Sequence, residues 1–248
     1  MKKYIYFFIL IFLSLMTYKV PVQLIINNIN NIDIAGVEGT IWNGSSKLVN
    51  INDTRLHNLR WHINLYSLFL FRVDATIIGN SNSGTFRSNL SIRNNKIYLN
   101  DTLADFSLSE FYRYLPISQV NGSISARLSQ IEINNSSMPI ISGELFINNL
   151  NAPLIYTTTN NERVELGDYK VIFFNDGNES IRASITNLEN NPIQVQGTLN
   201  ISQNKSYEIS GLIKSSGNQN TALIQGIELM TGSPDSSGFR SFNFTGTL

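Results

Sequence analysis

Two histidines are the first residues of the chain whose type and spacing could do chemistry. His57 and His62 lie five positions apart in the stretch L-H-N-L-R-W-H. The stretch is typical of a strand, and an odd spacing along a strand directs side chains to opposite faces of a sheet. Because the ligands of a metal must converge on one point, we expect no two-histidine metal site. We interpret both residues as surface or interface histidines.

The other candidates for catalysis are equally weak. Asp101 and Asp105 could share acid–base work, but their position near a turn and a strand is typical of exposed acids. The chain has no cysteine, which excludes disulfides, thiol catalysis and Cys-ligated metals. It also lacks the G-x-S-x-G elbow and the glycine-rich loops that hold phosphates. We therefore predict a protein that is not an enzyme and needs no cofactor or metal.

Composition narrows the possible partners. The 248 residues include 18 Lys and Arg against 18 Asp and Glu, so the chain is formally neutral. Binding to nucleic acid is driven by clustered cationic side chains, so it is a poor hypothesis for this chain. The hydrophobic fraction of 42% is sufficient for a sizeable core, and this length is ordinary for one all-β domain.

The amino terminus bears on localisation. Lys2 and Lys3 precede a run from Tyr4 to Tyr18 that contains no charged residue. As a helix this run would extend for roughly 22 Å, which is short for a bilayer core of about 30 Å. It could be a cleaved signal peptide, with the two lysines as its positive region, or an uncleaved signal anchor.

We favour the anchor. The run ends in M-T-Y-K-V-P without the small residues that a cleavage site requires. Tyrosines at both ends suit the membrane interfaces, and Lys19 can extend to the headgroups. The amino-terminal lysines would stay in the cytoplasm. We thus expect an anchor over residues 1–20 and one β-rich periplasmic domain over 21–248. The next most apolar run, Leu65 to Phe71, is too short to span a membrane.

The remainder of the chain alternates apolar and polar residues. Segments such as S-S-K-L-V-N-I-N, F-R-V-D-A-T-I-I and S-I-S-A-R-L-S-Q-I-E-I-N have a period of two, which predicts strands with one buried face. Asn-, Ser- and Gly-rich turns separate them at short, even spacings, and no βαβ period appears. We predict a mostly β fold. Its single, long, curled and largely antiparallel sheet would form an open groove or a flattened sandwich.

A few features interrupt or bend this pattern. Residues 108–115 and 221–229 have helical spacing, so two or three short helices are expected besides the transmembrane helix. Several strands begin with or contain glycine, at 39, 122, 143, 197, 211 and 246. Such glycines permit bulges or sharp bends that curl a sheet.

Both tryptophans of the chain lie close together. Trp42 is in G-T-I-W-N-G, and Trp61 follows 19 residues later. Continued alternation from Gly39 would place Ile41 and Trp42 on opposite faces of a strand, with Trp61 on a later strand. We expect at least one indole to be a large buried anchor of the first part of the sheet.

These segments resemble the protein N family of the bacterial type II (general) secretion pathway. The similarity begins with G-T-I-W-N-G at 39–44 and L-R-W-H-I-N-L at 59–65. It continues through S-G-E-L-F-I-N-N-L at 142–150, V-E-L-G-D-Y at 164–169, N-P-I-Q-V-Q-G-T-L-N-I at 191–201 and the closing S-P-D-S-S-G-F-R-S-F-N-F-T-G-T-L at 233–248. Family members often have a tryptophan where Phe146 stands and a proline where this chain has Leu65 and Tyr66. Because the proline is missing, the resemblance does not imply the conformation of the turn that follows Trp61.

The resemblance implies a single-pass protein of the bacterial inner membrane with its bulk in the periplasm. It would be a non-enzymatic accessory subunit that supports export of folded proteins, with other envelope components as partners and the membrane contacted through residues 4–18. No catalytic residue carries over. The motif positions with an expected structural role are Gly39, Trp42, Gly44, Trp61, Gly143, Gly167, Gly197, Asp235, Gly238, Arg240 and Gly246. The alternative is a periplasmic β-groove that handles lipid or another hydrophobic ligand, by analogy of fold alone.

Overall fold

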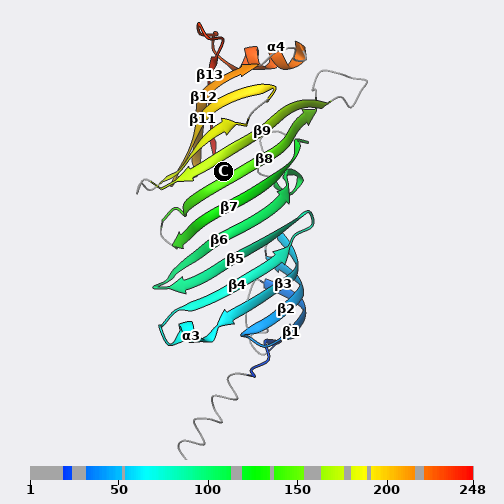
Figure 1. Cartoon of the computed structure of the whole chain (residues 1–248), viewed down its shortest axis with the longest axis vertical. Coiled ribbons are helices and arrows are strands. Elements are labelled where there is room, and N and C mark those ends of the chain that lie inside the picture. Colours follow the sequence, from blue (N-terminus) through cyan, green and yellow to red (C-terminus); the bar gives the residue numbers. More distant parts are fainter. Residues whose placement is uncertain are drawn as a thin grey trace, which may run out of the picture. The chain divides into compact units, whose positions relative to one another are not determined.

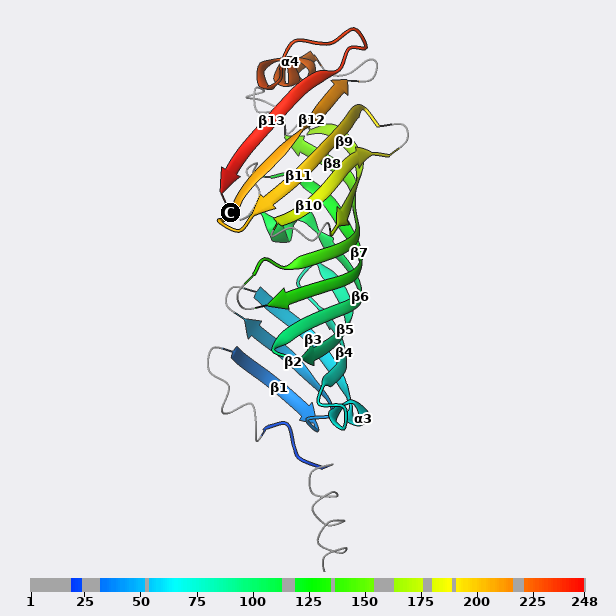
Figure 2. The same ribbon diagram turned by 90° about the vertical axis from the view of Figure 1, so that its left-hand side faces the viewer.

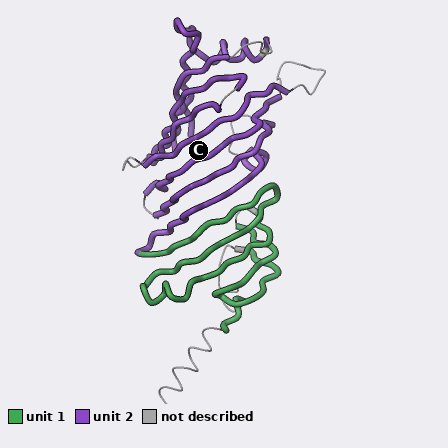
Figure 3. The backbone as a smooth tube through the Cα atoms, in the orientation of Figure 1, with its two compact units in different colours: residues 1–93 green, residues 94–248 purple. Residues whose placement is uncertain are grey.

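The computed structural model describes residues 19–23, 32–51, 54–112, 119–134, 137–153, 163–175, 180–188, 191–215 and 221–247. These residues form two compact units, residues 1–93 and 94–248 (Figure 3). The order of the 13 strands follows the order of the chain. Within each unit every pairing is antiparallel, as short polar turns between alternating segments predict.

Unit 1 is a meander of five strands (blue to cyan in Figure 1). Its strands are β1 (Ile32–Gly39), β2 (Asn43–Ile51), β3 (Thr54–Asn64), β4 (Val73–Asn80) and β5 (Gly84–Arg93). A one-turn helix, α3 (Leu65–Leu68), connects β3 to β4. Residues 20–23 return to the end of β1, where the Val20 carbonyl accepts from Ile41 N at 3.2 Å and Val22 N donates to Gly39 O at 3.4 Å.

Unit 2 continues the same pattern over eight strands (Figure 2). These are β6 (Lys96–Ser107), β7 (Asn121–Asn134), β8 (Ile140–Pro153), β9 (Arg163–Phe174), β10 (Ser180–Asn187), β11 (Ile193–Ser202), β12 (Ser206–Ser215) and β13 (Arg240–Thr247). A 3₁₀ turn, η1 (Leu108–Phe111), follows β6, and helix α4 (Thr221–Met230) precedes β13.

The mostly β, antiparallel fold is confirmed, and its short helices are close to those expected. The helix predicted at 221–229 is α4. Of the helix predicted at 108–115, residues 108–111 form a 3₁₀ turn and residues 113–115 lie outside the described residues. Residues 1–18, on which the transmembrane helix was predicted, also lie outside them. In the part of the chain that the structure describes, no helix has the length and apolarity needed to cross a membrane.

Each unit is a single layer. Within the described residues, the strands of a unit pack against their sheet neighbours, and no second sheet covers either face. The open-sheet alternative therefore fits the structure and the flattened sandwich does not. The largest fully buried side chains are therefore serines, Ser46, Ser67 and Ser88, while Val49, Val171 and Tyr169 are buried but keep a small exposed area.

Candidate functional site

The G-T-I-W-N-G stretch is a turn between β1 and β2. Thr40 N donates to Asn43 O at 3.0 Å, and Asn43 N donates to the Thr40 hydroxyl at 3.1 Å. Gly39 enters this turn with a φ of +93°, a conformation that favours glycine. The prediction that Ile41 and Trp42 lie on opposite faces of a strand is therefore wrong, because the chain reverses direction at these residues.

Trp61, on β3, is the tryptophan that holds this turn in place. Its indole nitrogen donates to Ile41 O at 2.9 Å. Its ring covers Gly44, its partner in the β2–β3 register, so closely that a Cβ at Gly44 would overlap Trp61 Cζ2. Trp42 is half-buried within the turn, and its carbonyl accepts from Ile63 N at 2.6 Å. Trp61 is likewise half-buried, so a buried aromatic anchor stays a prediction, for which the indole hydrogen bond makes Trp61 the stronger candidate.

A ring over a glycine recurs near the carboxyl end of the chain. Tyr207 on β12 lies opposite Gly246 on β13, and a Cβ at Gly246 would lie 2.5 Å from the phenolic oxygen. In unit 1, the Phe86 ring covers Gly79 in the same way. These glycines leave room for an aromatic side chain of the neighbouring strand, which fixes the strand register.

Two further motif glycines lie at irregularities of the sheet. Gly143 on β8 pairs with Leu128, beside a register shift in the β7–β8 ladder. Gly167 on β9 pairs with Leu150 at a second shift. At Gly167 the φ is +98° and the Asn191 side chain approaches within 2.5 Å of a would-be Cβ. The Asn191 amide oxygen accepts from Asp168 N at 2.8 Å, so this corner joins β9 to the start of β11.

The tail motif P-D-S-S-G-F-R forms the loop that leads into β13. The Asp235 carboxylate accepts from the backbone nitrogens of Ser237 and Phe239 at 2.8 and 2.9 Å, and Gly238 adopts a φ of +81°. Arg240 then donates to Gly232 O at 3.1 Å and to the Glu228 carboxylate at 2.8 Å. These contacts connect α4 to the first residue of β13. Gly197, another motif position, lies opposite Gly211 between β11 and β12.

One face of unit 2 is apolar across several strands. Opposed residues of an antiparallel pair share a face. The register aligns one row across β6 to β10: Ala104, Ala126, Leu145, Val171 and Ile185. A neighbouring row on the same face contains Phe106, Ile124, Ile147 and Tyr169. Burial raises the pKa of the Tyr169 phenol well above its ordinary value, with the Asp168 charge as a second cause.

The opposite face of unit 2 is polar and carries ion pairs. Lys170 Nζ lies 2.7 Å from the Glu144 carboxylate and 5.4 Å from the Phe146 ring centroid. The Arg127 guanidinium lies 5.6 Å from the same ring. Phe146, which stands where the family often has tryptophan, therefore packs between two cations. Exposed cation–π contacts of this kind stabilise a fold by about 0.5–1 kcal/mol each. We therefore interpret these contacts across β7 to β9 as structural and not as a ligand site.

The residues considered for chemistry do not converge. The His57 ring nitrogen Nε2 lies 3.0 Å from the Asn82 amide oxygen, and His62 is exposed opposite Thr76. Asp101 and Asp105 are both exposed on β6. Across the described ranges, no group of three or more His, Cys, Asp or Glu side chains could hold a metal ion.

The outer edge of β13 is the other surface that could bind a partner. β13 pairs with β12 on one side, and no described strand pairs with its other side. The segment before β13 covers the start of that side, where Gly232 N donates to Ser241 O at 2.9 Å. In unit 1, residues 20–23 likewise cover part of the outer edge of β1, where the Gln23 side chain donates to Val37 O at 3.0 Å. An uncovered edge is a template for another strand.

These features define an antiparallel β-meander protein with an apolar sheet face and an open edge strand, surfaces suited to binding. The family model for type II secretion system (T2SS) protein N matches residues 30–243. The chain belongs to this family, as its motifs indicate, and is a component of the type II secretion system. No curated protein and no solved structure matches the chain.

Proposed function

We propose that this protein is a non-enzymatic accessory subunit of the secretion apparatus, anchored in the inner membrane by residues 1–20. Residues 21–248 then lie in the periplasm and the amino terminus in the cytoplasm. The family match over most of the chain is the observation that carries the assignment. The uncharged run from Tyr4 to Tyr18 behind Lys2 and Lys3 supports the topology.

The outer edge of β13 is the surface that we assign to partner subunits. Its sequence R-S-F-N-F-T-G-T contains no proline or lysine, the residues that commonly block an edge strand. Beyond the start of β13, where Gly232 N already donates to Ser241 O, backbone groups on this edge can therefore hydrogen-bond to a strand of another envelope component of the secretion apparatus.

Site-specific photocrosslinking in living cells tests this assignment. A benzophenone side chain at Asn243, on β13, should form crosslinks to other secretion-system subunits. The same side chain at Gln196, which is exposed on the interior strand β11, serves as the matched control and should form few. Equal crosslinking at both positions would contradict edge docking, and deletion of the gene without loss of secreted enzymes would contradict the subunit role.

A topology reporter tests the orientation separately. Alkaline phosphatase fused after Leu248 is active only outside the cytoplasm, so the proposed topology predicts an active fusion. An inactive phosphatase, together with an active cytoplasmic reporter at the same position, would reverse the orientation.

The apolar face of unit 2 favours a second candidate function, the binding of lipid or another hydrophobic ligand. Its rows of apolar side chains have no second sheet over them in the described residues, and the turn η1 covers only one end, where the Phe111 ring lies 6.0 Å from that of Phe106. Photoactivatable phospholipid added to membranes that contain the full chain should then label peptides of β8 to β10. Labelling restricted to other segments would exclude this function.

A further inference from the structure

The connection between β3 and β4 differs in composition from most tight turns of the described chain, although the β1–β2 turn also contains the half-buried Ile41 and Trp42. Ser81–Ser83, Asn94–Asn95 and Gln203–Lys205 are polar. The β3–β4 connection instead contains Y-S-L-F-L-F between Leu65 and Arg72. We call residues 66–71 the apolar tip. Tyr66 is 81% exposed, Phe69 82%, Leu70 65% and Phe71 97%. A contiguous exposed patch of this kind marks an interaction surface.

Hydrogen bonds fix the backbone of the apolar tip. The buried Ser67 hydroxyl donates to Asn64 O at 2.7 Å and accepts from Asp74 N at 3.0 Å. Ser67 O accepts from the backbone nitrogens of Leu70 and Arg72 at 3.0 and 3.2 Å. The Ser67 hydroxyl and carbonyl are therefore hydrogen-bonded within the protein, while the large side chains of Tyr66, Phe69, Leu70 and Phe71 are exposed.

Phe71 has both a strained backbone and an exposed side chain. Its φ is +54°, a left-handed conformation that is strained for a bulky residue. The side chain gains little packing within the chain in return, since almost all of it is exposed. Strain without intramolecular packing is typical of a functional contact.

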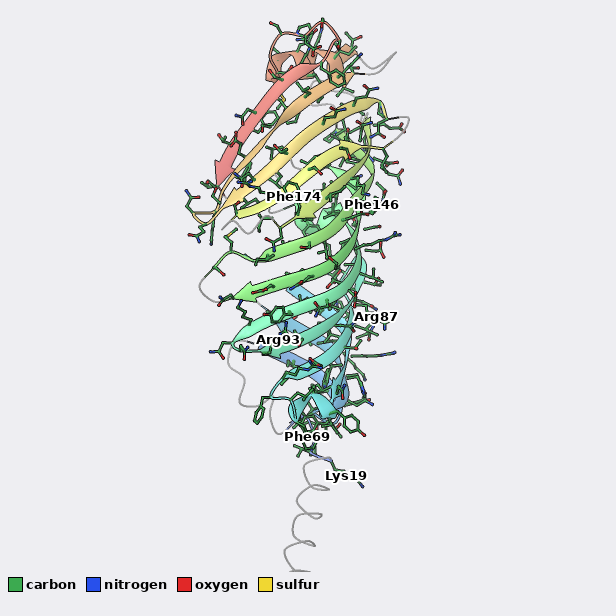
Figure 4. All side chains as sticks on the ribbon, turned by 60° about the vertical axis from the view of Figure 1, so that its left-hand side comes forward. Lys19, Phe69, Arg87, Arg93, Phe146 and Phe174 are labelled. Carbon is green, nitrogen blue, oxygen red and sulfur yellow. The ribbon has the colours of Figure 1, made fainter. Side chains whose placement is uncertain are left out.

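The position of the apolar tip identifies its partner. Figures 1 and 2 show α3 and the described residues 19–23 at the same end of unit 1, and Figure 4 labels Phe69 and Lys19 there. Short hydrogen-bonded steps connect the two segments: Val20 to Ile41 at 3.2 Å, and Trp42 to Ile63 at 2.6 Å, one residue before the Asn64 cap of α3. The uncharged run 4–18 thus joins unit 1 at this end.

The geometry points to the apolar tip as a second membrane contact, in which Tyr66, Phe69, Leu70 and Phe71 insert into the interfacial layer of the bilayer that holds the anchor. This inference rests on the proposed anchoring of residues 1–20. Aromatic side chains are enriched at this depth of a membrane, and an exposed apolar patch on an ordered scaffold binds there by burying its surface. Two contacts would fix the tilt of unit 1, which a single contact leaves free.

Fluorescence quenching in proteoliposomes tests this inference on the full-length chain. The native sequence has no cysteine, so one introduced cysteine gives one labelled site. An environment-sensitive dye on Phe69→Cys, in phosphatidylethanolamine–phosphatidylglycerol vesicles with nitroxide-labelled lipid, should be quenched several-fold more than the same dye on Thr85→Cys. Thr85 is exposed and lies at the opposite end of β4 and β5, about 25 Å away along the eight residues of β4.

A third label separates this inference from the proposed anchoring. A dye on Leu10→Cys reports whether the apolar run enters the bilayer. Quenching at position 10 without quenching at 69 would overturn the apolar tip and leave the anchor intact. Quenching at 69 without quenching at 10 would support the tip and overturn the anchor, and no quenching at either position would overturn both.

Two further results distinguish lipid from protein as the occupant. With the dye on Tyr66→Cys, the added substitutions Phe69→Ser and Phe71→Ser should remove most of the lipid quenching, since both side chains are exposed and their loss spares the fold. A dye at position 69 that is shielded from aqueous iodide but not quenched by lipid would show that a protein covers the tip. That result would overturn the membrane contact.

Discussion

At the scale of single residues, aromatic rings packed on glycines determine the strand registers near both ends of the described chain. Trp61 covers Gly44 and Tyr207 covers Gly246, in each case across one strand pair. A larger residue than glycine would displace the ring, and a smaller residue than the aromatic would leave a gap over bare backbone. Substitution of the glycine and substitution of the aromatic residue should therefore disturb the same contact.

The two tryptophans should differ in their contribution to stability. Trp61→Ala removes the ring over Gly44 and the hydrogen bond to Ile41 O, so we expect a loss of about 3 kcal/mol in the free energy of unfolding. Trp42→Ala, in the turn, should cost about 1 kcal/mol. Urea titration of the full chain in mild detergent, followed by circular dichroism, measures both. Equal losses would show that the turn depends on Trp42 as much as on Trp61.

Tyr169 should make the fold sensitive to alkali. Burial raises the pKa of its phenol above the ordinary value of 10.0, so folding favours the protonated form. The stabilisation is fully present below pH 10 and is lost as the pH rises beyond it. Tyr169→Phe loses the hydrogen bond to Leu166 O, which costs about 1 kcal/mol near neutrality.

A comparison of the wild type with Tyr169→Phe isolates the contribution of the Tyr169 phenol to stability. Melting temperatures of the wild type and of Tyr169→Phe, measured from neutral pH into the alkaline range, should converge as the wild type alone loses this contribution. A constant difference between them would show that the phenol has the same pKa in the folded and the unfolded state.

At the scale of elements, the sequence predicted the strands better than the connections between them. Alternation in segments such as residues 45–52 has one physical cause, a sheet with two unlike faces, and that cause acts locally. Turns depend on single backbone angles and on residues far along the chain. The position of residues 40–42 is fixed by Gly39 and by the Trp61 indole, 20 positions beyond Ile41.

The apolar tip shows the same limit for a candidate site. The run from Leu65 to Phe71 is too short to span a bilayer, and its apolar character is equally compatible with a buried core segment. Its exposure follows from the hydrogen bonds around Ser67, which direct the large side chains away from the sheet. No local pattern contains that information.

Relief of the backbone strain at Phe71 should raise the stability of the fold while it weakens the membrane contact of the apolar tip. Phe71→Asn places a residue that tolerates positive φ at a site where the native side chain is 97% exposed. We expect the free energy of unfolding to rise by about 1 kcal/mol, while lipid quenching of a dye at position 69 falls. Urea titration in detergent and the proteoliposome assay measure the two effects. Lower stability would show that Phe71 packs within the protein.

At the scale of the whole molecule, the chain combines zero formal net charge with an apolar amino-terminal run and an apolar tip. Its attachment to membranes should therefore depend on apolar burial and very little on charge, because long-range attraction to anionic lipid needs a net positive surface. The other apolar surface, the face of unit 2, combines half-buried side chains such as Leu145 with the buried Val171 and Tyr169.

Membrane extraction distinguishes apolar from electrostatic attachment. After washes of native membranes with high salt and then with alkaline carbonate, we expect the full chain to remain in the pellet, because screening weakens only charged contacts. A matched variant with Leu10→Lys and Leu13→Lys, whose apolar run can no longer enter the bilayer, should be released by carbonate. Release of the unmodified chain by salt alone would contradict apolar attachment.

The meander order also has a consequence for how the molecule is made. Within each unit a strand pairs with its neighbours in the chain, so each hairpin can form as soon as its second strand has emerged during synthesis, before any later residue exists. Such vectorial folding keeps contacts local and avoids slow closure of distant segments. At every stage the newest strand is the exposed margin of the growing sheet. Of the described strands β13 emerges last, and the part of its outer edge beyond Ser241 is the margin left for a partner when the other strands of unit 2 have paired.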